Sequence, residues 1–226
     1  GTIETFAAKA KIAYIDIDPS SINKNVAVDL PIVGDTQAVL KDLMKYFDEH
    51  NYICETSERQ EWLNQIAEWK KSVPLTYCQN GKVIKPQFVI ETLYKLTKGD
   101  AIITTEVGQN QMWTAQFFPF DKPNTFVTSG GLGTMGFGLP AAIGVKCAFP
   151  DKYVVDIAGD GSIQMNIQEL ATAAQYKINV KIVLLNNGYL GMVRQWQEFF
   201  HGNRYSESYM SSLPDFAKLA AAYGHV

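Results

Sequence analysis

Two short apolar runs on either side of one amphipathic segment constrain the fold of this chain more than any other feature. Residues 153–158 and 181–185 are rich in Val, Ile and Leu, and turn residues close each run. Such runs are typical of strands in a parallel sheet that is buried on both faces. Apolar residues recur between them at near-helical spacing: Ile167, Leu170, Ala171, Ala174 and Tyr176. This spacing predicts a helix, and therefore a strand, helix, strand unit.

Polar residues follow both predicted strands at the point where each ends. Asp160 stands in a Gly-Asp-Gly turn after the first strand, and Asn187 stands in an Asn-Asn pair after the second. A right-handed crossover makes the two strands parallel and puts both carboxyl ends at one edge of the sheet. Carboxylate and amide oxygens suit Mg²⁺, which completes its octahedron with phosphate oxygens. We therefore expect Asp160 and Asn187 to bind one Mg²⁺ and, through it, a diphosphate.

The glycines beside Asp160 support the same interpretation. Gly159 and Gly161 carry no Cβ, so the backbone can turn tightly and let a phosphate approach amide N–H groups near the next helix. The alternative is an ordinary loop, in which Asp160 caps a helix and Asn187 forms a turn with Gly188. The presence of both motifs at neighbouring strand ends favours the metal site.

Three longer stretches carry a resemblance to a known family. They read EVGQNQMW at residues 106–113, TSGGLGTMGFGLPAAIG at 128–144 and NNGYLGMVRQWQ at 186–197. With the Gly-Asp-Gly turn, they resemble the catalytic subunit of the acetolactate synthases, flavin-containing enzymes that use thiamine diphosphate. The similarity extends over nearly the whole chain and is strongest from residue 83 onward. It implies decarboxylation of pyruvate and carboligation to a second 2-keto acid, in branched-chain amino-acid biosynthesis.

The resemblance also implies which residues contact the cofactors and substrate. The implied thiamine diphosphate residues are Val107, Gln109, Asn110, Gly133, Met135, Gly159, Asp160, Gly161, Ser162, Asn187, Tyr189 and Met192. Mg²⁺ would be bound by Asp160, Asn187 and the backbone carbonyl of Tyr189. The 2-keto acid would face Met192, Val193 and Trp196. Asn110 stands where the family usually has histidine, so it can donate to a phosphate oxygen but cannot carry positive charge.

Plainer interpretations of three of these residues stay open. Met135 can be a core residue at a glycine-rich helix entry, and an adaptable thioether suits either role. Met192 and Trp196 stand one helical turn apart, and they can pack only against the rest of the sheet.

The N-terminal part reads as the tail of a nucleotide-binding α/β domain. Residues 11–17 predict a strand, residues 30–33 an extended piece, and Asp35 opens a helix. The resemblance implies that one group of residues lies at FAD: Asp16, Ile17, Ser21, Asp35 and Thr36. An acid at the carboxyl end of a strand can accept a hydrogen bond from a ribose hydroxyl. The same residues also fit as helix caps and turn formers.

The predicted fold class is α/β, with a parallel sheet flanked by helices. Three segments are expected: residues 1–50 as the end of a central FAD-binding domain, 51–85 as a linker with one helix, and 86–226 as a thiamine diphosphate- and Mg²⁺-binding domain that lacks its last elements. The final segment opens with a helix at 86–97 and a strand at 101–105.

No catalytic side chain is assigned to the chain itself. The resemblance places the glutamate that activates the cofactor on a separate N-terminal domain, and Glu106 does not match its position. The chain starts without Met, as a processed or excised piece would. We therefore expect this polypeptide alone to bind thiamine diphosphate weakly and to turn over no pyruvate.

Composition excludes several other classes of protein. A net charge of -3 and a pI near 5.6 offer no basic surface for nucleic acid. Cys54, Cys78 and Cys147 form no CxxC motif and read as reduced thiols of a cytoplasmic protein. Residues 127–145 are uncharged, but their glycines and Pro140 indicate a glycine-rich loop entering a helix rather than a membrane span. The resemblance implies a homodimer or higher homo-oligomer and a possible regulatory subunit.

Histidines show no ligand spacing in this chain. His50, His201 and His225 are scattered, and His201 is expected in a mobile loop near the site. Two other functions remain open: another thiamine diphosphate enzyme, of the pyruvate oxidase or keto-acid decarboxylase type, or a non-catalytic binding or scaffold fragment. Residues 192–196 favour the synthase. A dinucleotide-binding protein fits less well, because no G-x-G-x-x-G directly follows a predicted strand.

Overall fold

The structure, a computed structural model, describes residues 2–53 and 56–225. Cys54, one of the three expected free thiols, lies outside the described residues, while Cys78 and Cys147 are free and exposed. The chain divides into two compact units, Gly1–Pro74 and Leu75–Val226. Among the helices of the described ranges, none has both the length and the apolar character that crossing a bilayer requires.

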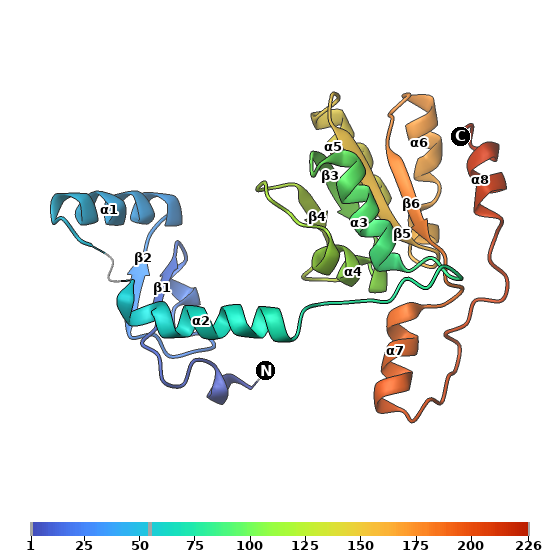
Figure 1. The fold of residues 1–226 in the computed structure, drawn as a ribbon. Helices are drawn as coiled ribbons and strands as arrows, with labels where there is room; N and C mark the ends of the chain where they lie inside the picture. The colour runs from blue at the N-terminus through green and yellow to red at the C-terminus, as the bar shows by residue number, and fades with distance from the viewer. Residues whose placement is uncertain (1, 54–55, 226) are drawn as a thin grey trace. The chain divides into compact units, whose positions relative to one another are not determined.

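The first unit contains a pair of parallel strands and two helices (Figure 1). Its elements are η1 (Ile3–Thr5), β1 (Ala13–Asp16), η2 (Pro19–Ser21), β2 (Leu30–Val33), α1 (Thr36–Glu49) and α2 (Ser57–Ser72). The register pairs Asp16 with Val33, so Asp16 ends β1 at the same edge where Asp35 follows β2. The predicted strand, extended piece and helix are all present.

The second unit is built on a four-stranded sheet with the order β4-β3-β5-β6, in which all neighbours run parallel (Figure 1). The strands are β3 (Ala101–Thr105), β4 (Phe126–Thr128), β5 (Tyr153–Gly159) and β6 (Lys181–Leu185). The other elements are α3 (Pro86–Thr97), α4 (Gln109–Phe117), α5 (Gly138–Ala148), η3 (Ile163–Asn166), α6 (Glu169–Gln175), α7 (Gly191–Phe200) and α8 (Phe216–Ala222). This architecture confirms the predicted fold class.

Alternate strand residues face two different helical layers. On one face, Ile103 and Ile157 pack with Ile90 of α3. On the other face, Ile102 and Val154 pack with Ala142 of α5. Burial on both faces explains why these strands read as continuous apolar runs. The parallel pairing of β3, β5 and β6 puts their carboxyl ends at one edge of the sheet.

Local structure differs from the sequence expectation at two places. The segment expected to be a glycine-rich loop entering a helix begins with strand β4, and α5 then starts at Gly138. Helix α4, which begins at Gln109, was not among the expected elements. A three-residue strand is too short to show a pattern, and α4 has no clear apolar stripe, so periodicity detects neither.

Candidate functional site

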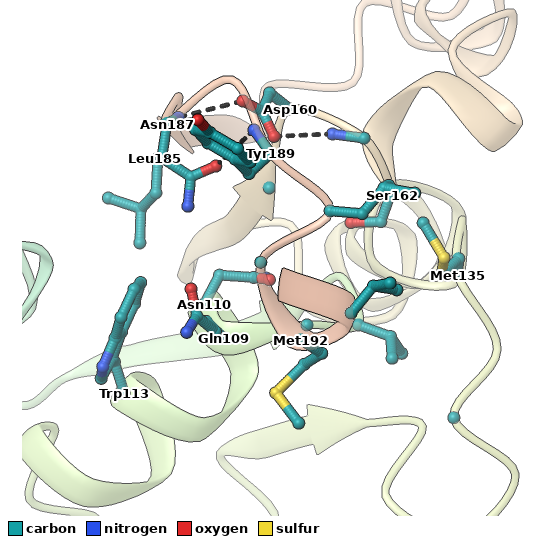
Figure 2. Close-up of a pocket in the computed structure, with 18 residues that line it drawn as sticks. Gln109, Asn110, Trp113, Met135, Asp160, Ser162, Leu185, Asn187, Tyr189 and Met192 are labelled. Carbon is teal, nitrogen blue, oxygen red and sulfur yellow. Dashed lines mark hydrogen bonds between the residues drawn. The ribbon is translucent and has the colours of Figure 1, made fainter. Parts of the chain in front are cut away.

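Asp160 joins the loops that follow β5 and β6. Its Oδ2 accepts hydrogen bonds from the backbone N–H groups of Asn187 at 2.9 Å and Gly188 at 2.6 Å, and its Oδ1 accepts from Gly161 N–H at 2.9 Å. The two loop tips are therefore in contact, as the topology predicted, and Figure 2 shows Asp160 beside Asn187. Asp160 does not cap a helix. A carboxylate has about four acceptor sites, so three N–H bonds leave room for a cation.

The other two expected metal ligands lie in the same loop. Asn187 Oδ1 accepts from Tyr189 N–H at 2.9 Å, so the turn that was the alternative interpretation is present as well. The Gly188 carbonyl and the Leu190 N–H make the bonds that pair this loop with residues 208–210. Those bonds do not use the Tyr189 carbonyl, which leaves it available to a metal ion.

Residues 206–210 return to the site after α7 and hold its edge. Leu190 N–H donates to the Ser208 carbonyl at 2.8 Å, and Met210 N–H donates to the Gly188 carbonyl at 2.9 Å. The Ser208 side chain is buried and donates to Gln197 Oε1 at 2.7 Å. His201 lies in the segment that was expected to be mobile. Beyond His201, residues 208–210 of this segment are hydrogen-bonded to α7 and to the loop that follows β6. Sequence patterns carried no signal for this return.

One pocket of about 190 Å³ lies at this edge of the sheet. All the residues expected to contact thiamine diphosphate line it, and Val193 lines it as well (Figure 2). Lining residues that the sequence analysis did not name are Gly108, Trp113, Leu185, Leu190 and Gly191. Trp196 is not among the lining residues. It is 59% exposed and stacks edge-on against Phe200, so the structure does not bring this expected substrate residue into the pocket.

Two features of the pocket fit a diphosphate. Ser162 is 2% exposed, and its Oγ has no hydrogen-bond partner among the described residues. An unpartnered buried hydroxyl indicates a missing polar ligand. Gly161 is the second feature, because a Cβ there would lie 2.8 Å from Leu190 Cδ2 and 3.3 Å from Met210 Sδ. The absence of a side chain at Gly161 lets the Leu190 and Met210 side chains pack closely beside Asp160.

Asn110 makes two hydrogen bonds that the sequence analysis did not predict. It is buried, and its Nδ2 donates to the backbone carbonyls of Glu106 at 3.0 Å and Ile157 at 2.8 Å. These two bonds use both amide hydrogens, so neither is left for a phosphate oxygen. Asn110 therefore lines the pocket and links the ends of β3 and β5, and its contact with the cofactor stays a prediction.

Two acids near the pocket, Glu106 and Asp156, are fully buried, and the sequence analysis assigned a role to neither. Burial raises the pKa of Asp156 well above its usual value, and the neighbouring Glu106 raises it further. Burial also raises the pKa of Glu106, against the opposing effect of backbone N–H groups that hydrogen-bond to it. An acid inside the apolar run of β5 was a usable signal, because unpaired buried carboxyls are rare.

The residues expected at FAD belong to the first unit. Asp35 caps α1 through a bond from Ala38 N–H at 2.9 Å, and Asp16 accepts from Asp18 N–H and the Tyr14 hydroxyl. These contacts lower the pKa of Asp16, and the bond from Asp18 has the largest effect. Ser21 ends η2, Ile17 is 71% exposed and Thr36 is the first residue of α1. Helix capping by Asp35 and turn formation by Asp16 therefore explain the local positions of these two acids.

Comparison with known families identifies the class of protein that this fold and site define. Residues 106–226 match the family described as thiamine pyrophosphate enzyme, C-terminal TPP binding domain, and residues 1–43 match thiamine pyrophosphate enzyme, central domain. The chain therefore belongs to the thiamine pyrophosphate enzymes.

Individual relatives are more specific. The chain is 54% identical over 221 residues to the acetolactate synthase isozyme 3 large subunit of Escherichia coli (strain K12), covering 98% of this chain and 38% of the relative. It is 49% identical over 231 residues to the probable acetolactate synthase large subunit of Methanocaldococcus jannaschii, with 99% and 38% coverage. Identity to the acetolactate synthase of Mycobacterium bovis is 46%, with 100% and 37% coverage. The chain thus spans about two fifths of the length of these relatives.

Proposed function

We propose that this chain is part of an acetolactate synthase large subunit, which decarboxylates pyruvate and joins the product to a second 2-keto acid. The observation that carries the proposal is the link from Asp160 to the loop at Asn187, beside the Ser162 hydroxyl, which has no hydrogen-bond partner in the part of the chain that the structure describes. The names of the relatives support the same reaction.

Mg²⁺ would be held by Asp160, Asn187 Oδ1 and the Tyr189 carbonyl, and diphosphate oxygens and water would fill the rest of its octahedral coordination. Ser162 would donate to the diphosphate. When bound, thiamine diphosphate supplies the nucleophilic carbon that attacks a 2-keto acid. A cavity of about 190 Å³ is smaller than the ~300–1,000 Å³ of a typical complete ligand site, so it suits the diphosphate end of the cofactor best.

Met135, Met192 and Val193 would form the apolar wall beside the cofactor rings and the substrate. Trp196 would face the substrate only if α7 shifted, or if another part of the enzyme packed over Trp196 and extended the site to it. Asp16, Ile17, Ser21, Asp35 and Thr36 would lie at FAD in the central domain. The proposal also includes a cytoplasmic homo-oligomer that binds a regulatory subunit. Residues 51–85 would be the linker between the FAD-binding and thiamine diphosphate-binding domains.

Product analysis tests the proposed reaction. The protein, as its source makes it, would be incubated with pyruvate, thiamine diphosphate, Mg²⁺ and FAD. The proposal predicts acetolactate, and mixed products when 2-ketobutyrate is added. Acetaldehyde alone would indicate a decarboxylase, acetate or acetyl phosphate an oxidase, and no product a binding fragment. Each of these outcomes would contradict the proposal.

A further inference from the structure

Glu106 and Asp156 are neighbouring carboxyls that lie behind the pocket rather than on its wall. Glu106 directly follows β3, and the sheet register pairs Asp156 of β5 with Thr104. Because alternate strand residues face one side, both acids face α5. A Cβ at Gly138, in the first turn of α5, would overlap Asp156 Oδ1 and lie 2.5 Å from Glu106 N. The two acids and the start of this helix are therefore in close contact.

The two carboxyls differ in their hydrogen bonds. Glu106 Oε2 accepts from Gly136 N–H at 2.7 Å, and its Oε1 accepts from Leu139 N–H at 3.0 Å. These donors include an N–H group of the first turn of α5, where the helix dipole favours a negative charge. Asp156 accepts only from the Thr104 hydroxyl at 3.1 Å, and its Oδ2 has no partner in the described ranges. A negative charge is therefore more stable on Glu106.

We propose that this pair carries one negative charge, on Glu106, and that the charge positions residues 133–139, and with them Met135, at the cofactor pocket. The inference rests on the proposed cofactor site. Two adjacent buried carboxyls do not both ionise, so Asp156 keeps its proton. Asn166 Nδ2 donates to the Gly136 carbonyl at 2.8 Å. Both the N–H and the carbonyl of Gly136 are therefore hydrogen-bonded to side chains from other elements. Glu106 is thus a positioning residue.

No other charged group competes for this pair in the elements packed against it. Helix α4, strand β4, η3 and residues 129–137 contain no titratable side chain. The charged groups of the remaining packed elements have other surroundings: Lys146 donates to the Pro150 and Lys152 carbonyls, Glu169 accepts from Thr172, Asp160 holds its loop, and Lys181 and Tyr153 are exposed. The acids therefore titrate against each other.

Isosteric amides at each position test the assignment of the charge. Glu106→Gln, Asp156→Asn and the exposed control Asp151→Asn would be made in the protein as its source makes it. Calorimetry would measure the thiamine diphosphate affinity with Mg²⁺ between pH 5.5 and 8, and amide hydrogen exchange would follow Gly136 and Leu139. We expect Glu106→Gln to weaken binding about tenfold or more and to speed exchange at both amides. Asp156→Asn should cost less than about threefold, and Asp151→Asn should match the unmodified protein.

Burial raises the pKa of Glu106, so the affinity of the unmodified protein should fall on acidification together with faster exchange at Gly136, because protonated Glu106 releases the segment. Glu106→Gln should have lost that pH dependence. The reverse ranking, with Asp156→Asn the damaging change, would overturn the proposal. If Glu106→Gln does not fold, Asp156→Asn and the pH dependence of amide exchange in the unmodified protein test the proposal instead. Exchange at Gly136 that does not change with pH would contradict the proposed charge on Glu106. If the unmodified protein does not bind thiamine diphosphate, the proposed function fails, while exchange at Gly136 still tests the pair.

Discussion

At the scale of single residues, Asp160 is both a structural link and the expected metal ligand. Its carboxylate accepts N–H bonds from its own turn and from the loop after β6, so the two strand ends are already joined. Such an arrangement is preorganised, because little reordering remains when a cation binds. It depends on the absence of a side chain at Gly161, where the next loop approaches closely.

Gly161→Ala should therefore be costly. The added Cβ would lie 2.8 Å from Leu190 Cδ2 and 3.3 Å from Met210 Sδ, so these two side chains must move from their packed positions. We expect a loss of about 1–3 kcal/mol in the free energy of unfolding, as for other overpacked sites. Urea unfolding at pH 7 measures it.

Gly144→Ala is the matched control. A Cβ at Gly144 meets no atom within 4 Å, and the residue lies inside α5, so alanine should stabilise by roughly 0.5–1 kcal/mol. Equal effects of the two substitutions would contradict the close approach at Gly161.

Topology made Asp160 and Asn187 predictable, because each follows a readable strand and neighbouring parallel strands end together. Glu106 and Asp156 are 50 positions apart by their numbering, and no spacing rule connects them. Their proximity depends on the strand register and on the packing of α5. For Trp196, helical spacing gave a prediction that the pocket does not support. Trp196 shares a helical face with Met192, but only Met192 lines the pocket.

At the scale of elements, the strands with continuous apolar runs could be read from sequence, while β4 and α4 could not. The return of residues 206–210 depends on backbone hydrogen bonds to Gly188 and Leu190, which any side chain can make. Side-chain patterns therefore do not reveal it.

Ser208→Ala should loosen this return. Its buried hydroxyl donates to Gln197 Oε1, whose amide nitrogen in turn donates to the Ser206 carbonyl. Removing the bond should cost about 0.5–1.5 kcal/mol of unfolding free energy and speed amide exchange at Leu190 and Met210. Ser211→Ala, at an exposed neighbour, should change neither quantity. Unaltered exchange at both amides in Ser208→Ala would contradict the anchoring role.

At the scale of the whole molecule, Asp156 makes folding depend on pH. Its pKa is raised in the folded state, so the folded chain keeps a proton that the unfolded chain loses above about pH 4. The associated stabilisation is complete below that pH and is lost as the pH rises toward the folded-state pKa.

The Asp156→Asn variant has no titratable side chain at this position, so the variant lacks this loss of stability. The difference in unfolding free energy between the variant and the unmodified protein should therefore shift in favour of the variant as the pH rises from 4 to 7. Urea unfolding at several pH values measures the difference, and Asp151→Asn should follow the unmodified protein. Parallel curves for Asp156→Asn and the unmodified protein would show that Asp156 is not held protonated.

The most direct test of the central claim is a calorimetric titration of thiamine diphosphate, with and without Mg²⁺, into the protein as its source makes it and into two variants. We expect binding that requires Mg²⁺, a loss of affinity of about tenfold or more in Asp160→Asn, and none in the exposed control Asp151→Asn. Circular dichroism would show that both variants are folded. Undiminished, Mg²⁺-dependent binding by folded Asp160→Asn would contradict the assignment of this strand end as the cofactor's metal site.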